Sequence, residues 1–144
     1  MIQNEREYRI TRSQAEKFSR ALEESDSYGG ADPLLAELHR SALNSQLGEL
    51  REEMAEYEAL KSGLVQDIEI DSLDALPRAL IRARIASGMS QKQLAERLGL
   101  KEQQVQRYET SAYAGASLTR LRDISGALGL TLSGALHLPR RGGG

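Results

Sequence analysis

Few side chains in this sequence could carry out catalysis or hold a metal ion. There is no cysteine, and the only two histidines, His39 and His137, lie nearly a hundred positions apart. Such a chain has no thiolate nucleophile and almost no material for a histidine-built zinc site or a Ser-His-Asp triad. Its serines and acidic residues form no group that joins a base, an orienting residue and an oxyanion donor. We therefore expect no enzymatic activity and neither a metal nor a cofactor.

A dense set of polar side chains lies between residues 101 and 107. The amides of Gln103 and Gln104 can form paired hydrogen bonds with adenine, and the Arg107 guanidinium can do so with guanine. Glu102 can accept a hydrogen bond from cytosine, or it can simply favour a helix N-terminus. We predict that these four residues read base pairs. The alternative for each is a solvated surface residue.

The elements that would position these residues follow from capping signals. Pro77 opens an apolar-periodic helix that ends at Gly88, and Ser90 with Gln93 has the spacing of a capping box for a short helix that stops at Gly99. A helix from Glu102 to about Thr110 follows after three residues, and a further helix runs from about residue 117 to 129. Two short helices joined by a turn that contains glycine make a helix-turn-helix.

Residues 90–109, SQKQLAERLGLKEQQVQRYE, resemble the core of phage-repressor and xenobiotic-response-element type regulators. The resemblance covers roughly residues 76–129, and it implies that the helix 102–110 enters the major groove. It also implies that Gln91 contacts a phosphate and braces the reading helix. We expect Glu109 to tie the reading helix to the preceding fold rather than to touch DNA. Lys92 and Lys101, at the starts of the two motif helices, are further phosphate candidates, and Arg82, Arg84, Arg97 and Arg120 could add to them.

One departure from the family concerns the position of a fifth helix, which often forms the dimer contact in its members. Here residues 131–139 read TLSGALHLP, whose alternation favours a strand. Residues 65–70 alternate too, so we expect a minor two-stranded element that pairs 65–70 with 130–138. Dimerisation would then use the N-terminal helices or a shared sheet.

Two helices are expected before this region. Thr11 and Gln14 have capping-box spacing for a helix that ends at residue 23 or 24, and Asp32-Pro33 opens a long helix to about Lys61. The long helix carries one apolar stripe of Leu43, Leu47, Leu50, Met54 and Tyr57. Either the first helix or the second domain covers the stripe, or another copy or a partner protein does. Gly48 inside this helix suggests a close approach by a neighbour.

Charge divides the chain. Residues 1–63 carry 8 Lys and Arg against 13 Asp and Glu, residues 64–75 carry 4 acidic residues, and residues 76–144 carry 11 basic against 4 acidic residues. A basic half suggests a polyanionic partner. No apolar run of ~20 residues and no secretory signal is present, so we expect a cytoplasmic protein away from membranes.

Together these observations predict a mainly α-helical protein with four parts. They are an acidic helical arm (1–63), a linker with a short strand (64–75), a helix-turn-helix domain (76–139) and a flexible tail (140–144). The expected function is a sequence-specific DNA-binding regulator, a homodimeric repressor that binds double-stranded DNA. The alternative is an antitoxin whose arm neutralises a toxin protein, since the arrangement is similar to antitoxins of the host-inhibition-of-growth type.

Overall fold

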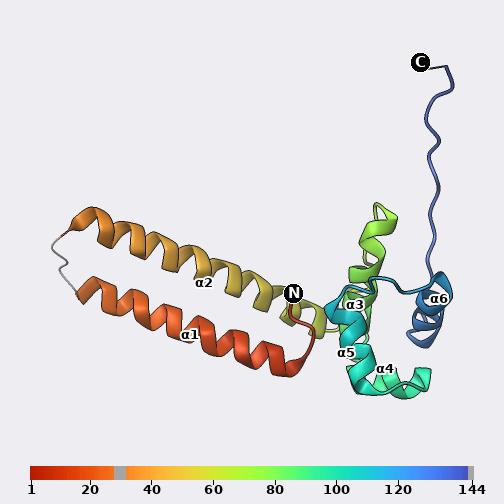
Figure 1. The fold of residues 1–144 in the computed structure, drawn as a ribbon, viewed down its shortest axis with the longest axis horizontal. Coiled ribbons are helices and arrows are strands. Elements are labelled where there is room, and N and C mark those ends of the chain that lie inside the picture. Colours follow the sequence, from red (N-terminus) through yellow and green to blue (C-terminus); the bar gives the residue numbers. More distant parts are fainter. Residues whose placement is uncertain (28–31, 143–144) are drawn as a thin grey trace.

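The computed structural model describes residues 1–27 and 32–142 and is mainly helical (Figure 1). Helices α1 (Glu5–Ser27) and α2 (Pro33–Lys61) form a long antiparallel hairpin. A short 3-10 helix, η1 (Leu73–Ala75), leads into a group of four short helices. These are α3 (Leu76–Ala86), α4 (Gln91–Leu98), α5 (Glu102–Thr110) and α6 (Leu118–Ala127).

The hairpin forms because the two long helices cover each other's apolar stripes. Leu43, Leu47 and Tyr57 of α2 are buried, as are Thr11 and Ala15 of α1. The α2 stripe therefore packs on the first helix, and this part of the sequence interpretation is confirmed. Asp32 caps α2 as expected, because its side chain accepts from the Leu34 N–H at 3.0 Å.

Helix α1 begins seven residues before the predicted start. Asn4 provides the cap: its side chain accepts from the Glu7 N–H at 2.9 Å, while the Glu7 carboxylate accepts from the Gln3 N–H at 2.7 Å. This reciprocal pair satisfies N–H groups that the first turn of a helix leaves open. The capping box predicted at Thr11 is wrong, because Thr11 is buried in the middle of α1.

The short helices and the base of the hairpin share one core. Ile81, Leu94, Val105 and Ile124 are almost completely buried and bring α3, α4, α5 and α6 together. Ile2, Tyr57 and Leu60 belong to the same cluster. The hairpin is therefore anchored in the core of the short-helix group by apolar contacts, in addition to its connection through residues 62–72.

Two further expectations are wrong. Residues 65–70 and 130–138 are extended but form no strand, so the described chain contains no two-stranded element. From the sequence, no fifth helix is expected after α6, and residues 130–140 indeed form none. A Cβ placed on Gly48 would meet no atom within 4 Å, so this glycine marks no close approach. The loop expected at residues 28–31 and the end of the tail, 143–144, lie outside the described residues.

Candidate nucleic-acid interface

Helices α4 and α5 form the predicted helix-turn-helix, and the local sequence explains where each begins and ends. The Ser90 hydroxyl accepts from the Gln93 N–H at 3.1 Å, and the Gln93 side chain accepts from the Ser90 N–H at 2.9 Å. Gly99 ends α4 in the left-handed region with φ 67°, which costs glycine little, and the Leu100 N–H returns to the Ala95 carbonyl at 2.8 Å. The capping box at Ser90 and the stop at Gly99 are confirmed.

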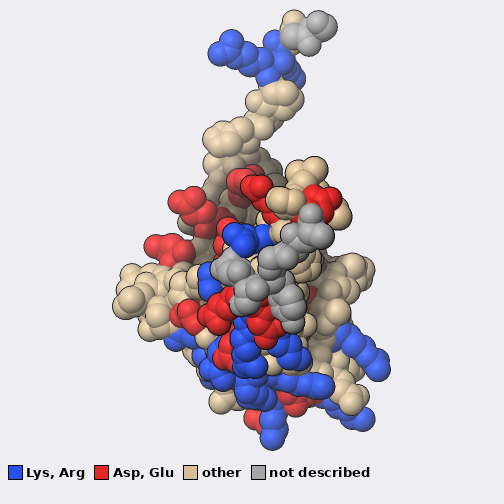
Figure 2. Space-filling view, turned by 90° about the vertical axis from the view of Figure 1, so that its left-hand side faces the viewer, with Lys and Arg blue, Asp and Glu red and all other residues tan. Residues whose placement is uncertain are grey.

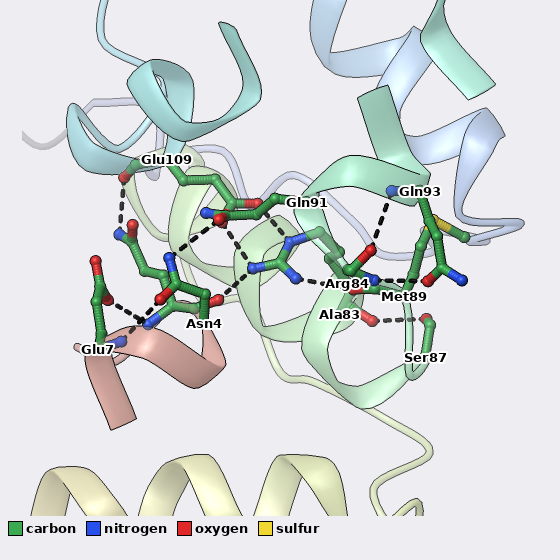
Figure 3. Close-up of polar contacts among 11 residues, drawn as sticks. Asn4, Glu7, Ala83, Arg84, Ser87, Met89, Gln91, Gln93 and Glu109 are labelled. Carbon is green, nitrogen blue, oxygen red and sulfur yellow. Dashed lines mark hydrogen bonds and ion pairs between the residues drawn. The ribbon is translucent and has the colours of Figure 1, made fainter. Parts of the chain in front are cut away.

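A buried ion pair holds α5 against α3 (Figure 3). The Arg84 guanidinium donates to both Glu109 carboxylate oxygens, from Nε at 2.6 Å and from Nη2 at 2.8 Å. The two side chains are 4% and 0% exposed, and Arg84 also donates to the Met89 carbonyl at 2.8 Å. A bidentate pair of this kind fixes orientation as well as distance. It therefore sets the angle of α5 on its support.

The N-terminal segment completes the same cluster (Figure 3). The Gln3 side chain donates to the Glu109 carbonyl at 3.0 Å, and the Gln3 carbonyl accepts from Arg84 Nη2 at 2.6 Å. The Asn4 amide donates to Gln91 Oε1 at 3.0 Å, and Gln91 donates to Glu109 Oε1 at 2.9 Å. Residues 3, 4, 84, 91 and 109 thus connect the start of α1 with α3, α4 and α5.

The sequence reasoning anticipated only part of this cluster. The role expected for Glu109 is confirmed, because it pairs with the preceding fold. Arg84 is misplaced in the prediction: it is buried and uses its donors internally, so it does not offer its charge to a phosphate. An arginine within the apolar face of α3, 25 residues before an acidic residue within α5, was the available signal. No pattern pointed to Gln3 or Asn4.

The base-reading candidates lie on the first two turns of α5, and all four are exposed. Gln103 and Arg107 lie one turn apart and line a shallow depression with Gln106, Thr110 and Ser111. The Gln104 side chain accepts from the Lys101 N–H at 2.8 Å, so in this structure it helps to begin the helix. Opposite them, Val105 and Glu109 are buried, and α5 therefore presents one polar face outward over a fixed inner face.

The phosphate candidates differ in their exposure and in their bonding partners. Lys92 and Lys101 are exposed at the starts of α4 and α5, and no ion pair involves either of them in the described part of the chain. Gln91 is buried at 4% exposure, with its amide bonded to Asn4 and Glu109. Of the other candidates, Arg82 pairs with Glu56 at 2.7 Å, and Arg97 donates to the Ala127 carbonyl at 2.9 Å.

Arg120, the remaining phosphate candidate, lies beside the end of α5. Its guanidinium is 4.0 Å from Asp123 and stands over the Tyr108 ring. Tyr108 is half-buried and stacks on Tyr113 with ring centroids 5.6 Å apart. Tyr113 itself is buried, and this burial, with the nearby Glu109 charge, raises the pKa of its hydroxyl well above its usual range. The two rings support the end of α5.

Basic side chains also follow α1. Arg6, Arg9, Arg12, Lys17 and Arg20 are all exposed along this helix. Viewed from the far end of the hairpin, Lys and Arg gather on the lower side of the molecule, the side on which α1 and α4 lie in Figure 1 (Figure 2). The segment 1–63 is acidic in sum, and five of its eight Lys and Arg residues lie on α1.

Other kinds of site find no support in the described residues. No group of three or more His, Asp or Glu side chains there could hold a metal ion. Among the same residues, no helix is long and apolar enough to cross a membrane.

Residues 80–134 match the family model for helix-turn-helix domains. The match covers most of α3, all of α4, α5 and α6, and the residues just after them, and it confirms the resemblance to regulators of the xenobiotic-response-element type. No curated protein and no solved structure matches the chain. The C-terminal part of this protein is therefore a helix-turn-helix domain of the kind that transcriptional regulators use to bind DNA, and the α1–α2 hairpin lies outside the match.

Proposed function

We propose that the protein is a sequence-specific, cytoplasmic DNA-binding repressor that acts as a homodimer and inserts α5 into the major groove. The observation that carries the proposal is the contrast between the two faces of α5. Its inner face is locked by the buried Arg84–Glu109 pair, and its outer face presents Gln103 and Arg107 to solvent. A rigid helix with amide and guanidinium groups at groove-facing positions is suited to direct base readout.

In this proposal the parts of the chain have separate tasks. Glu102, Gln103, Gln104 and Arg107 read base edges, and Lys92 and Lys101 contact phosphates beside them. The buried Gln91 takes part by bracing α4 against α5, with its first-turn backbone close to the DNA. Residues 76–139 form the DNA-binding domain, 1–63 the arm and 64–75 the linker. One motif reads only a few base pairs, so useful specificity requires two half-sites about one helical turn apart.

The test begins with selection of bound sequences from random oligonucleotides, which is expected to yield an inverted repeat. Arg107→Ala is expected to cost about 1–3 kcal/mol at one base pair and to relax preference there. Lys101→Ala is expected to weaken binding to all sequences alike and to lower the salt slope by about one. Arg51→Ala, which removes the same charge from the exposed surface of α2, is the matched control. If Arg107→Ala and Lys101→Ala leave both the preference and the salt slope unchanged, α5 is not the reading helix.

A second candidate function is supported by the far end of the hairpin. Leu34, Leu35 and Leu38 are 58–66% exposed near the start of α2. Contiguous exposed leucines indicate a protein-binding surface. We propose as the alternative that the arm binds and neutralises a toxin. Co-expression with the product of a neighbouring gene tests it: Leu34→Asp with Leu38→Asp must abolish both co-purification and protection of growth, whereas DNA binding persists.

A further inference from the structure

A groove crosses the short-helix group on a face that includes no residue of α4 or α5. Its floor is formed by α3 and α6, with Ala79, Ala83, Leu121 and Ser125 among the lining residues. The extended segments 65–71 and 129–133 form its sides. The groove is therefore separate from the proposed DNA-reading surface, and its small floor residues leave room for an extended chain.

The segment that follows, residues 134–140, leaves this groove and extends away from the molecule (Figure 1). Leu136 and Leu138 are 91% and 85% exposed. No hydrogen bond or ion pair in the described structure joins residues 131–140 to another part of the chain. An extended segment with exposed leucines and unpaired backbone groups is suited to binding another protein surface.

Charge indicates which surface this is. The side of the groove formed by residues 65–71, continued by η1, carries Asp67, Glu69, Asp71 and Asp74, all exposed. The extended segment ends in Arg140 and Arg141, which are exposed as well. No ion pair joins the two sets within the described chain. The segment and the groove of the same sequence are thus complementary in both apolar character and charge, while the segment points away from its own groove.

We propose that two copies of this chain exchange their C-terminal segments, so that residues 134–141 of each copy lie in the groove of the other. Such an exchange is isologous and closes as a dimer with two-fold symmetry. Leu136 and Leu138 lie over α3 and α6 of the partner copy, and Arg140 and Arg141 lie beside the partner's acidic segment. The inference gives the proposed homodimer its contact surface, and it leaves both α5 helices free.

The mass of the full chain in the absence of DNA tests this exchange separately from DNA binding. Wild-type protein is expected at twice the chain mass of 15.9 kDa by sedimentation or light scattering. Leu136→Asp is expected to raise the dimer dissociation constant by about tenfold or more, because a leucine leaves apolar cover and a charge replaces it. Leu34→Asp places the same change on the exposed hairpin end and is expected to leave the dimer intact.

Charge reversal then identifies the contact. Arg140→Glu with Arg141→Glu is expected to weaken self-association. In a mixed dimer of that variant with one that carries Asp67→Lys and Asp71→Lys, both exchange contacts again join opposite charges, so the heterodimer is expected to form at low salt where neither variant self-associates. Because the protein has no cysteine, Leu136→Cys also accepts a single photocrosslinker. Its product is expected at dimer mass and attached to residues 65–71 or 118–126.

Three outcomes would overturn the exchange. They are a monomeric wild-type protein at high micromolar concentration, a dimer unaffected by Leu136→Asp, and a crosslink formed within one chain. If Leu34→Asp rather than Leu136→Asp dissociates the dimer, the hairpin forms the contact instead. If Leu136→Asp dissociates the dimer but the wild-type dimer does not bind DNA, the result supports the exchange and counts against the proposed function alone.

Discussion

Replacing Glu109 by Gln removes one charge from the buried cluster and keeps the shape of the side chain. Arg84 then remains 4% exposed with its positive charge and no carboxylate partner. Removal of one partner from a buried ion pair costs about 3–5 kcal/mol, because the remaining charge is no longer compensated. No cavity forms, so the loss measures the pairing rather than packing. With total stabilities of about 5–15 kcal/mol, this change removes a large share.

Urea unfolding followed by circular dichroism measures the effect. With a urea dependence of about 2 kcal/mol per molar, Glu109→Gln is expected to lower the midpoint by about 2 M. The control is Glu56→Gln, which breaks the half-exposed pair with Arg82, where the two side chains are 38% and 36% exposed. Such pairs contribute about 0–1 kcal/mol, so the control midpoint is expected to change little.

The double variant Arg84→Met with Glu109→Leu tests whether the lost stability comes from the unpaired charge of Arg84 or from the replacement of residue 109 itself. It removes both charges together, so we expect it to recover most of the stability lost in Glu109→Gln. Hydrogen exchange is expected to rise at Gln3 in the single variant, because Arg84 also donates to the Gln3 carbonyl. A fall of less than about 1 kcal/mol in Glu109→Gln, or a double variant less stable than the single one, would refute this reasoning.

Three further predictions concern other parts of the molecule. Burial raises the pKa of Tyr113 above the usual 10, so unfolded chains lose this proton at a lower pH than folded chains do. The free energy of unfolding is therefore expected to fall above about pH 10, and Tyr113→Phe is expected to flatten that fall in urea titrations at pH 9–11. Gly99→Ala places a side chain at φ 67° and is expected to cost about 1 kcal/mol; an unchanged melting temperature would contradict the strained cap. If the cations of α1 lie beside bound DNA, Arg6→Glu with Arg9→Glu lowers affinity for all sequences and reduces the salt slope, whereas equal slopes would place α1 away from DNA.

The sequence predicts the helix-turn-helix well because its signals are local. Ser90 with Gln93 and the glycine at 99 define α4 within a few residues of the chain, and α5 follows after a short turn. The start of α1 was missed because Thr11 and Asn4 both carry cap-compatible patterns, and only Asn4 also bonds to Gln91. That bond joins residues 87 positions apart, which no local pattern encodes.

The expected strands failed for a different physical reason. Alternation of apolar and polar residues in 65–70 and 130–138 shows that one side of each segment is apolar, but it does not identify the partner. In the structure the first segment and the start of the second turn apolar residues toward the groove, while the remainder of the second is exposed. Among the site residues, exposure of Gln103 and Arg107 follows from helical periodicity. The burial of Arg84 depends on Glu109, 25 positions away.

The anchoring of the hairpin has a mechanical consequence. Helix α2 has 29 residues and forms a rigid rod of about 44 Å. Its C-terminal end lies in the same core as α5 through Tyr57 and Leu60. The start of α1 is fastened to the end of α5 by Gln3. A force applied to the start of α2, at the other end of the rod, therefore acts as torque on the core that holds α5. A protein bound there would change the orientation of α5 as well.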